Sequence, residues 1–138
     1  MTRRLRTFYR LALIAYLALV AFLCLGHFQS TPDIPKSLFG IPMDKIVHFL
    51  MFLPFPPLVY LAVDKYTQKT WHSLLFALGV FALGCLLAAS TEWIQGLTPY
   101  RSRDVLDFQA DTLALGIGTV IVFLVDIGKQ RKARRAQG

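Results

Sequence analysis

The uncharged stretch LALIAYLALVAFLCLG, residues 11–26, decides the class of fold to which this chain belongs. Together with its flanking residues it is long enough, as a helix, to cross the hydrocarbon layer of a bilayer, which is about 30 Å thick. Arginines precede it, so a cleaved signal peptide is the rival interpretation. However, the run exceeds the roughly 7–15 apolar residues of a signal peptide. We therefore expect an uncleaved membrane helix over about residues 8–28.

Three further apolar runs follow, at Ile46–Val63, Ser73–Ser90 and Leu113–Ile127. The last run is short for a full crossing, which needs about 20 residues. Starting that helix near Phe108 supplies them and draws Asp111 below the membrane surface. We expect helices over about residues 45–63, 72–91 and 107–127.

Three prolines, Pro54, Pro56 and Pro57, fall in the middle of the second run. In water they would end a helix, because proline lacks the amide hydrogen that the helix requires. Inside a membrane bundle the neighbouring helices satisfy the freed carbonyls, so we expect a kink or a break. Further prolines and a glycine in residues 27–43 predict an irregular external loop.

The composition supports a membrane protein. Of the 138 residues, 55% are hydrophobic, and the mean hydropathy is +0.51. These residues fall in long runs instead of being spread evenly. The sequence therefore predicts an all-α, integral membrane four-helix bundle with short loops. We expect residues 1–138 to form a single membrane domain, with residues 128–138 as a basic cytoplasmic tail.

The distribution of lysine and arginine predicts the orientation. With the N-terminus inside, the cytoplasmic segments hold 11 of these residues and the external loops hold 4. This is the asymmetry of the positive-inside rule, so we expect both ends in the cytoplasm, N-in and C-in. The net charge of +7 sits at the chain ends and beside apolar runs. We therefore expect membrane lipids as partners and no nucleic acid.

Polar side chains gather at the predicted outer ends of the second and third spans. Asp44 and His48 are four residues apart where the second span begins, and Glu92 and Gln95 are three apart where the third ends. At these spacings each pair shares one face of its helix. Both pairs are therefore expected on the same side of the membrane.

A third set leads into the fourth span. Asp104, Asp107 and Asp111 form one stripe at helical spacing, and Arg101 and Arg103 lie in the loop before them. Carboxylates in or near hydrocarbon are costly unless they are paired or face a wet interior. The convergence of these groups from three helices therefore predicts a site. Only Asp64 and Asp126, among the acids, are assigned to the cytoplasmic side.

The same residues have a purely structural alternative. Arg101 can bridge Glu92 and Asp107 merely to fasten the third and fourth spans together. Gln95 can cross-link helices, and His48 can be a hydrogen-bonded packing residue. Fastening alone would need fewer costly charges, which favours the site.

These motifs also resemble those of the VanZ-like family of small bacterial membrane proteins. The shared patterns are Asp44-Lys45-x-x-His48-Phe49, Glu92-x-x-Gln95, and Arg101 followed by Asp107 and Asp111. The resemblance covers about residues 40–120. The chain departs from the family at Asp111, where Asn is usual, and at Ala114, where Gly is frequent. The resemblance implies a multi-pass protein of the bacterial inner membrane and a link to resistance against the glycopeptide teicoplanin. It names no reaction.

We expect the site to bind or modify an envelope lipid or a lipid-linked precursor at the outer face. The candidate catalytic residues are Asp44, His48, Glu92 and Asp107, with Asp44 orienting His48 as an acid or base. The candidate ligand-binding residues are Gln95, Arg101, Arg103, Asp104 and Asp111. Of these, the arginines would hold a phosphate through their forked donors. Glu92 and Asp107 are also candidate oxygen ligands for a divalent cation.

Two other classes of function remain open. A non-catalytic structural or assembly protein would use the charged residues only to lock the helices. An ion-coupled transporter is disfavoured by four short helices without a repeat. Enzymatic activity stays open, because no nucleophile with a nearby base and no glycine-rich phosphate loop is evident. The sequence also leaves the cofactor and the oligomeric state open.

Overall fold

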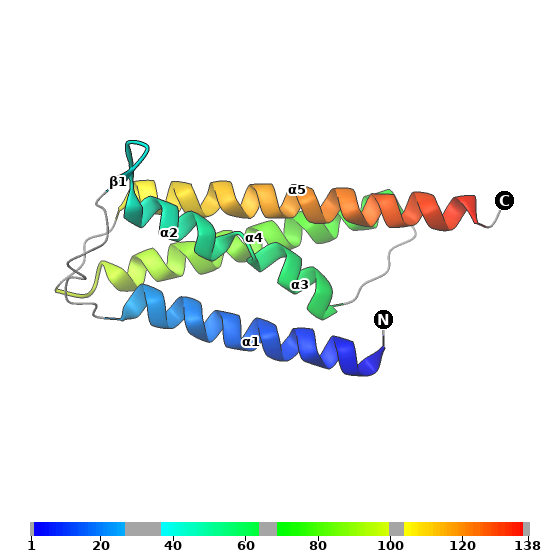
Figure 1. Cartoon of the computed structure of the whole chain (residues 1–138), viewed down its shortest axis with the longest axis horizontal. Helices are drawn as coiled ribbons and strands as arrows, with labels where there is room; N and C mark the ends of the chain where they lie inside the picture. The colour runs from blue at the N-terminus through cyan, green and yellow to red at the C-terminus, as the bar shows by residue number, and fades with distance from the viewer. Residues whose placement is uncertain (1, 27–36, 64–68, 100–103, 137–138) are drawn as a thin grey trace.

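The computed structural model describes residues 2–26, 37–63, 69–99 and 104–136. Its helical spans run side by side along the long axis of the molecule (Figure 1). The helices are α1 (Arg3–Leu25), α2 (Met43–Phe52), α3 (Phe55–Val63), α4 (Thr70–Gln95) and α5 (Val105–Arg135). With α2 and α3 counted as one span, the described residues contain four spans that are long and apolar enough to cross a membrane. The predicted all-α four-helix bundle is confirmed.

The last helix is longer than the sequence predicted. Helix α5 has 31 residues and continues to Arg135, so residues 128–135 of the expected basic tail are helical. Lysine and arginine in the last turn favour this extension, because cations interact well with the negative end of the helix dipole. At 1.5 Å per residue the helix is about 46 Å long, which exceeds the hydrocarbon thickness.

The predicted interruption of the second span is also confirmed. Helix α2 ends at Phe52 and α3 begins at Phe55, with Pro54 between them. The break redirects the chain: α2 packs mainly against α5, whereas α3 packs mainly against α1. The hydroxyl of Tyr16, in α1, donates to the carbonyl of Met51 beside the break at 2.6 Å. A neighbouring helix thus satisfies a carbonyl at the interruption.

A two-residue hairpin precedes α2. Strands β1 (Ser37–Leu38) and β2 (Ile41–Pro42) pair antiparallel, and Ser37 lies opposite Pro42. The turn residues Phe39 and Gly40 have φ angles of 52° and 80°. Positive φ at both positions is typical of the tight hairpin turn that matches strand twist. The described part of the expected irregular loop is therefore regular and leads directly into α2.

Small residues let the helices approach closely at the centre of the bundle. A side chain on Gly84 of α4 would lie 2.5 Å from Leu115 of α5 and 3.1 Å from Phe55 of α3. Gly118 of α5 packs against the Leu53 carbonyl and the ring of Pro56, each 3.0 Å from where a Cβ would lie. Close packing of this kind drives helix association in lipid.

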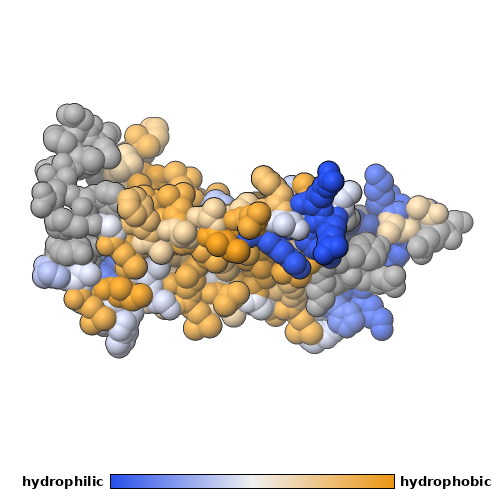
Figure 2. Space-filling model, turned by 90° about the horizontal axis from the view of Figure 1, so that it is seen from below, coloured by the Kyte–Doolittle hydropathy of each residue, from blue (hydrophilic) through white to orange (hydrophobic). Residues whose placement is uncertain are grey.

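The outer surface suits a lipid environment. Many large apolar side chains are exposed, among them Phe22, Leu86 and Leu124. Figure 2 shows one face that is hydrophobic over most of its length, with hydrophilic side chains gathered toward the end where both termini lie. Apolar surface of this extent on the spans fits contact with acyl chains.

Two glycines of α5 provide a test of the packing. Gly118→Ala should lower the free energy of unfolding by about 1–3 kcal/mol, because the new methyl meets a backbone carbonyl and a rigid ring. Gly128→Ala is the matched control, since no described atom beyond its chain neighbours and the surrounding backbone of its own helix lies within 4 Å of the added Cβ. The control should be neutral or stabilising by up to about 1 kcal/mol. Unfolding in detergent micelles measures both, and equal effects would contradict this packing.

Candidate functional site

The predicted outer ends of three spans lie together at one end of the bundle. The start of α2, the end of α4 and the start of α5 share that end, and both termini lie at the opposite one (Figure 1). Seven ionisable side chains from these helix ends form what we call the polar cluster: Asp44, Lys45, His48, Glu92, Asp104, Asp107 and Asp111. The predicted convergence of α2, α4 and α5 is therefore present in the structure.

Lys45 joins the start of α2 to the start of α5. Its ammonium nitrogen lies 3.1 Å from an oxygen of Asp44 and 2.5 Å from Oδ1 of Asp107, and it also pairs with Asp104. The lysine side chain is only 12% exposed, so these contacts are largely shielded from solvent. Lys45 was not among the predicted site residues, although it belongs to the shared motif that includes Asp44 and His48. Its position directly after Asp44 was the available signal.

Asp104 connects all three helix ends. Its side chain accepts from the amide of Leu106 at 2.8 Å and so caps α5. Its own amide donates to Oε2 of Glu92, in α4, at 3.2 Å. The hydrogen bond from Lys45 lowers the pKa of the Asp104 carboxyl. A lowered pKa means that this pairing stabilises the fold at neutral pH and is lost as the pH falls through that pKa.

His48 is buried between carboxylates. Its Nδ1 lies 3.1 and 3.3 Å from the two oxygens of Asp111, which has no exposed surface. Its Nε2 lies 3.8 Å from Oδ2 of Asp107. Asp44 was expected to orient this ring, but the hydrogen bonds of the Asp44 carboxylate go to Lys45. The carboxylate that orients His48 is Asp111, from a different helix.

Glu92 is the least satisfied member of the polar cluster. Its side chain is 9% exposed, and Oε1 lies 3.9 Å from Nδ1 of His48. This oxygen is buried and has no hydrogen-bond donor among the described residues. A buried carboxylate oxygen without a donor is costly. Glu92 is therefore not explained by a fastening role alone.

The remaining predicted residues divide into two groups. Gln95 donates from Nε2 to the carbonyl of Cys24 at 2.9 Å and so ties the end of α4 to the end of α1. Its ligand-binding role stays a prediction. Arg101 and Arg103 lie outside the described residues, and so does any bridge from Arg101 to Glu92 and Asp107.

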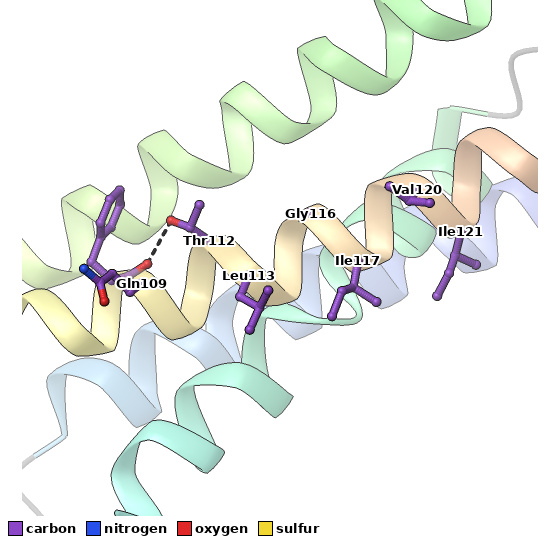
Figure 3. Close-up of a pocket in the computed structure, with 8 residues that line it drawn as sticks. Gln109, Thr112, Leu113, Gly116, Ile117, Val120 and Ile121 are labelled. Atoms are coloured by element: carbon purple, nitrogen blue, oxygen red, sulfur yellow. Dashed lines mark hydrogen bonds between the residues drawn. The ribbon is translucent and has the colours of Figure 1, made fainter. Parts of the chain in front are cut away.

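An apolar groove begins beside the polar cluster. A small, mostly apolar cavity of about 230 Å³ lies between α4 and the start of α5, and its lining consists of Ala89, Glu92, Trp93, Asp104, Val105 and Phe108. Phe108 also begins a groove of about 680 Å³ that follows α5 to Ile121. Figure 3 shows the lining side chains following one another along this helix, with the Thr112 hydroxyl donating to the backbone carbonyl of Phe108 at 2.8 Å. The polar cluster thus continues sideways into a surface of hydrocarbon character.

A second buried polar group lies nearer the opposite end. The hydroxyls of Tyr60 and Ser73 and the amide of Gln130 all donate to Asp126. Asp126 is only 4% exposed. The sequence analysis predicted its side of the membrane but not its burial or its partners. The four-residue spacing of Asp126 and Gln130 was the signal that could have found this group. It joins α3, α4 and α5.

Comparison with known proteins places the chain in a family. The sequence profile of the VanZ/LLP1 family matches residues 4–126, a range that contains the whole polar cluster. Neither the curated proteins nor the solved structures include a match. Because the profile covers nearly the whole chain and four spans can cross a membrane, this chain is a multi-pass membrane protein that belongs to the VanZ/LLP1 family.

Proposed function

We propose that the chain binds or modifies an envelope lipid, or a lipid-linked precursor, through the polar cluster. The observation that carries this proposal is the continuity at Phe108. This residue lines both the small cavity that Glu92 and Asp104 border and the groove along α5. A polar site that opens onto an apolar groove fits a molecule with a polar head and a hydrocarbon tail.

We place the polar cluster at the extracytoplasmic face of the bacterial inner membrane. Both termini lie at the end of the bundle opposite the cluster (Figure 1). The basic residues near the two chain ends favour the cytoplasm for that end. A lipid of the outer leaflet would then reach the cluster by lateral diffusion, with its tail beside α5.

The head group would meet two kinds of chemistry. Arg101 and Arg103, in the loop before α5, are suited to a phosphate. His48 is the residue of the cluster whose ordinary titration range lies near neutral pH. It is therefore our candidate for proton transfer if the bound molecule is modified, with Asp111 holding the ring.

A structural or assembly role is the alternative, and the contacts of Lys45 favour it. One ammonium group with three carboxylates joins two helix starts and would lock the bundle without any ligand. Glu92 argues against a lock alone, because its buried Oε1 adds charge without a described donor. The link to teicoplanin resistance that the family resemblance implies also stays a proposal, which antibiotic susceptibility of a deletion strain tests.

Filling the groove should weaken lipid binding. Leu113 lines the groove and is 60% exposed, whereas Leu124 is 61% exposed on the same helix outside it. Leu113→Trp should reduce cross-linking to a phospholipid that carries a photoreactive acyl chain. Leu124→Trp is the matched control and should leave the cross-linking unchanged. Mass spectrometry of the labelled peptides gives the yield. Equal yields from both variants, or no label on residues 108–121 of the unaltered chain, would contradict the proposal.

Two substitutions distinguish a binding site from a purely structural role of the polar cluster. Lys45→Met should lower the free energy of unfolding by about 2 kcal/mol, because a charged donor shared by three carboxylates is lost. Glu92→Gln should leave stability unchanged or raise it, since the amide oxygen still accepts from Asp104 and a buried charge is removed. Thermal unfolding of the purified chain compares them. Comparable losses in both variants would identify the whole cluster as a lock.

A further inference from the structure

Two groups of potential metal ligands lie within the polar cluster, and Lys45 distinguishes them. The outer group consists of Asp44, Asp104 and Asp107, and the ammonium of Lys45 contacts all three. The deeper group consists of His48, Glu92 and Asp107. A protein cation therefore already bridges the three carboxylates of the outer group. In the deeper group Lys45 contacts only Oδ1 of Asp107, whose Oδ2 faces Nε2 of His48. Among the described residues, His48 and Glu92 have no lysine contact.

We propose that His48, Glu92 and Asp107 bind a divalent transition-metal cation, Mn²⁺ or Zn²⁺. One potential ligand atom from each residue lies within 4.8 Å of the other two. Metal bonds of about 2.0–2.2 Å place neighbouring ligand atoms about 3.4 Å apart. The 3.8 Å between Nε2 of His48 and Oδ2 of Asp107 is close to that value. The other separations in the group are at most 4.8 Å, so binding requires the side chains to rotate toward the cation.

Glu92 gives the independent sign of a ligand. Its side chain is more than nine-tenths buried, and its Oε2 accepts from the amide of Asp104. Its Oε1 lies 3.9 Å from Nδ1 of His48, so this oxygen must move toward Nε2 to share a cation with Asp107. That oxygen has no described hydrogen-bond donor. A cation between Glu92, His48 and Asp107 would satisfy it and would offset the mutual repulsion of the carboxylates.

Asp111 completes the arrangement as the partner of the ligand. Its carboxylate lies within hydrogen-bond distance of Nδ1 of His48, so with a cation bound at Nε2 the proton on Nδ1 would donate to Asp111. This leaves the lone pair on Nε2, the nitrogen nearer Asp107. A ligating histidine whose second nitrogen donates to a carboxylate is the usual arrangement in protein metal sites.

The donor set selects the metal. One imidazole and two carboxylates suit Mn²⁺ or Zn²⁺ better than Mg²⁺ or Ca²⁺, which prefer oxygen ligands alone. Three protein ligands also leave a coordination position for an outside oxygen. A phosphate oxygen of a head group in the adjoining cavity would suit that position. This last role rests on the proposed lipid function, whereas metal binding itself does not.

The test uses the full chain in lipid-depleted detergent, purified without a polyhistidine tag. Isothermal titration with MnCl₂ or ZnCl₂ should show saturable binding of one cation per chain. Glu92→Gln and His48→Gln should each weaken binding about tenfold or more. His72→Gln is the matched control, because His72 is exposed at the start of α4, and it should bind as tightly as the unaltered chain.

A spectroscopic readout keeps the proposal testable if a variant fails to fold. Electron spin-echo spectroscopy of Mn²⁺ bound to the unaltered chain should show coupling to a nitrogen nucleus, which must come from an imidazole ligand. Absence of saturable binding for both metals, absence of nitrogen coupling, or equal affinities in all folded variants would overturn the proposal. No lipid is added, so a negative lipid cross-linking result would leave this outcome unaffected.

Discussion

The contact between His48 and Asp111 is the constraint on which the polar end of the bundle depends. Both side chains are buried, and a titratable ring removed from water must be partnered by another polar group. Because His48 is on α2 and Asp111 is on α5, their pairing fixes the rotation of one helix against the other. Lys45 lies about one turn nearer the start of α2 than His48. It contacts Asp104 and Asp107, which likewise lie nearer the start of α5 than Asp111. Glu92 of α4 then completes the enclosure.

The proline break makes this enclosure compatible with a compact bundle. Helix α2 stays against α5, where the polar contacts are made, and α3 turns toward α1. Pro57 removes the amide that would bond to the Leu53 carbonyl, and that carbonyl packs against Gly118. The residues that look most disruptive in the sequence therefore direct the chain between two partner helices. The small residues opposite them provide the space.

Much of this architecture could be predicted from sequence because lipid imposes strong rules on it. The length of the apolar runs predicted the four spans, and the prolines in the second run predicted its break. Helical spacing gave the convergence of polar residues. The partner of His48 could not be predicted in this way. Spacing along α2 suggested Asp44, whereas the orientation of α2 against α5 brings Asp111 to the ring. The buried contacts of Asp126 with Tyr60 and Ser73 depend on three helices packing together, which no single periodicity contains.

The distance between the His48 ring and the Asp111 carboxyl in a lipid bilayer tests this account most directly. Solid-state NMR on chain carrying ¹⁵N-labelled histidine and ¹³C-labelled aspartate can measure the dipolar coupling between Nδ1 and Cγ. With Nδ1 3.1 Å from the nearer oxygen, the account predicts a coupling for a separation of about 4 Å. It also predicts that Asp111→Asn removes this coupling, since the asparagine is unlabelled. A His48 nitrogen without coupling to any aspartate carboxyl would contradict the arrangement.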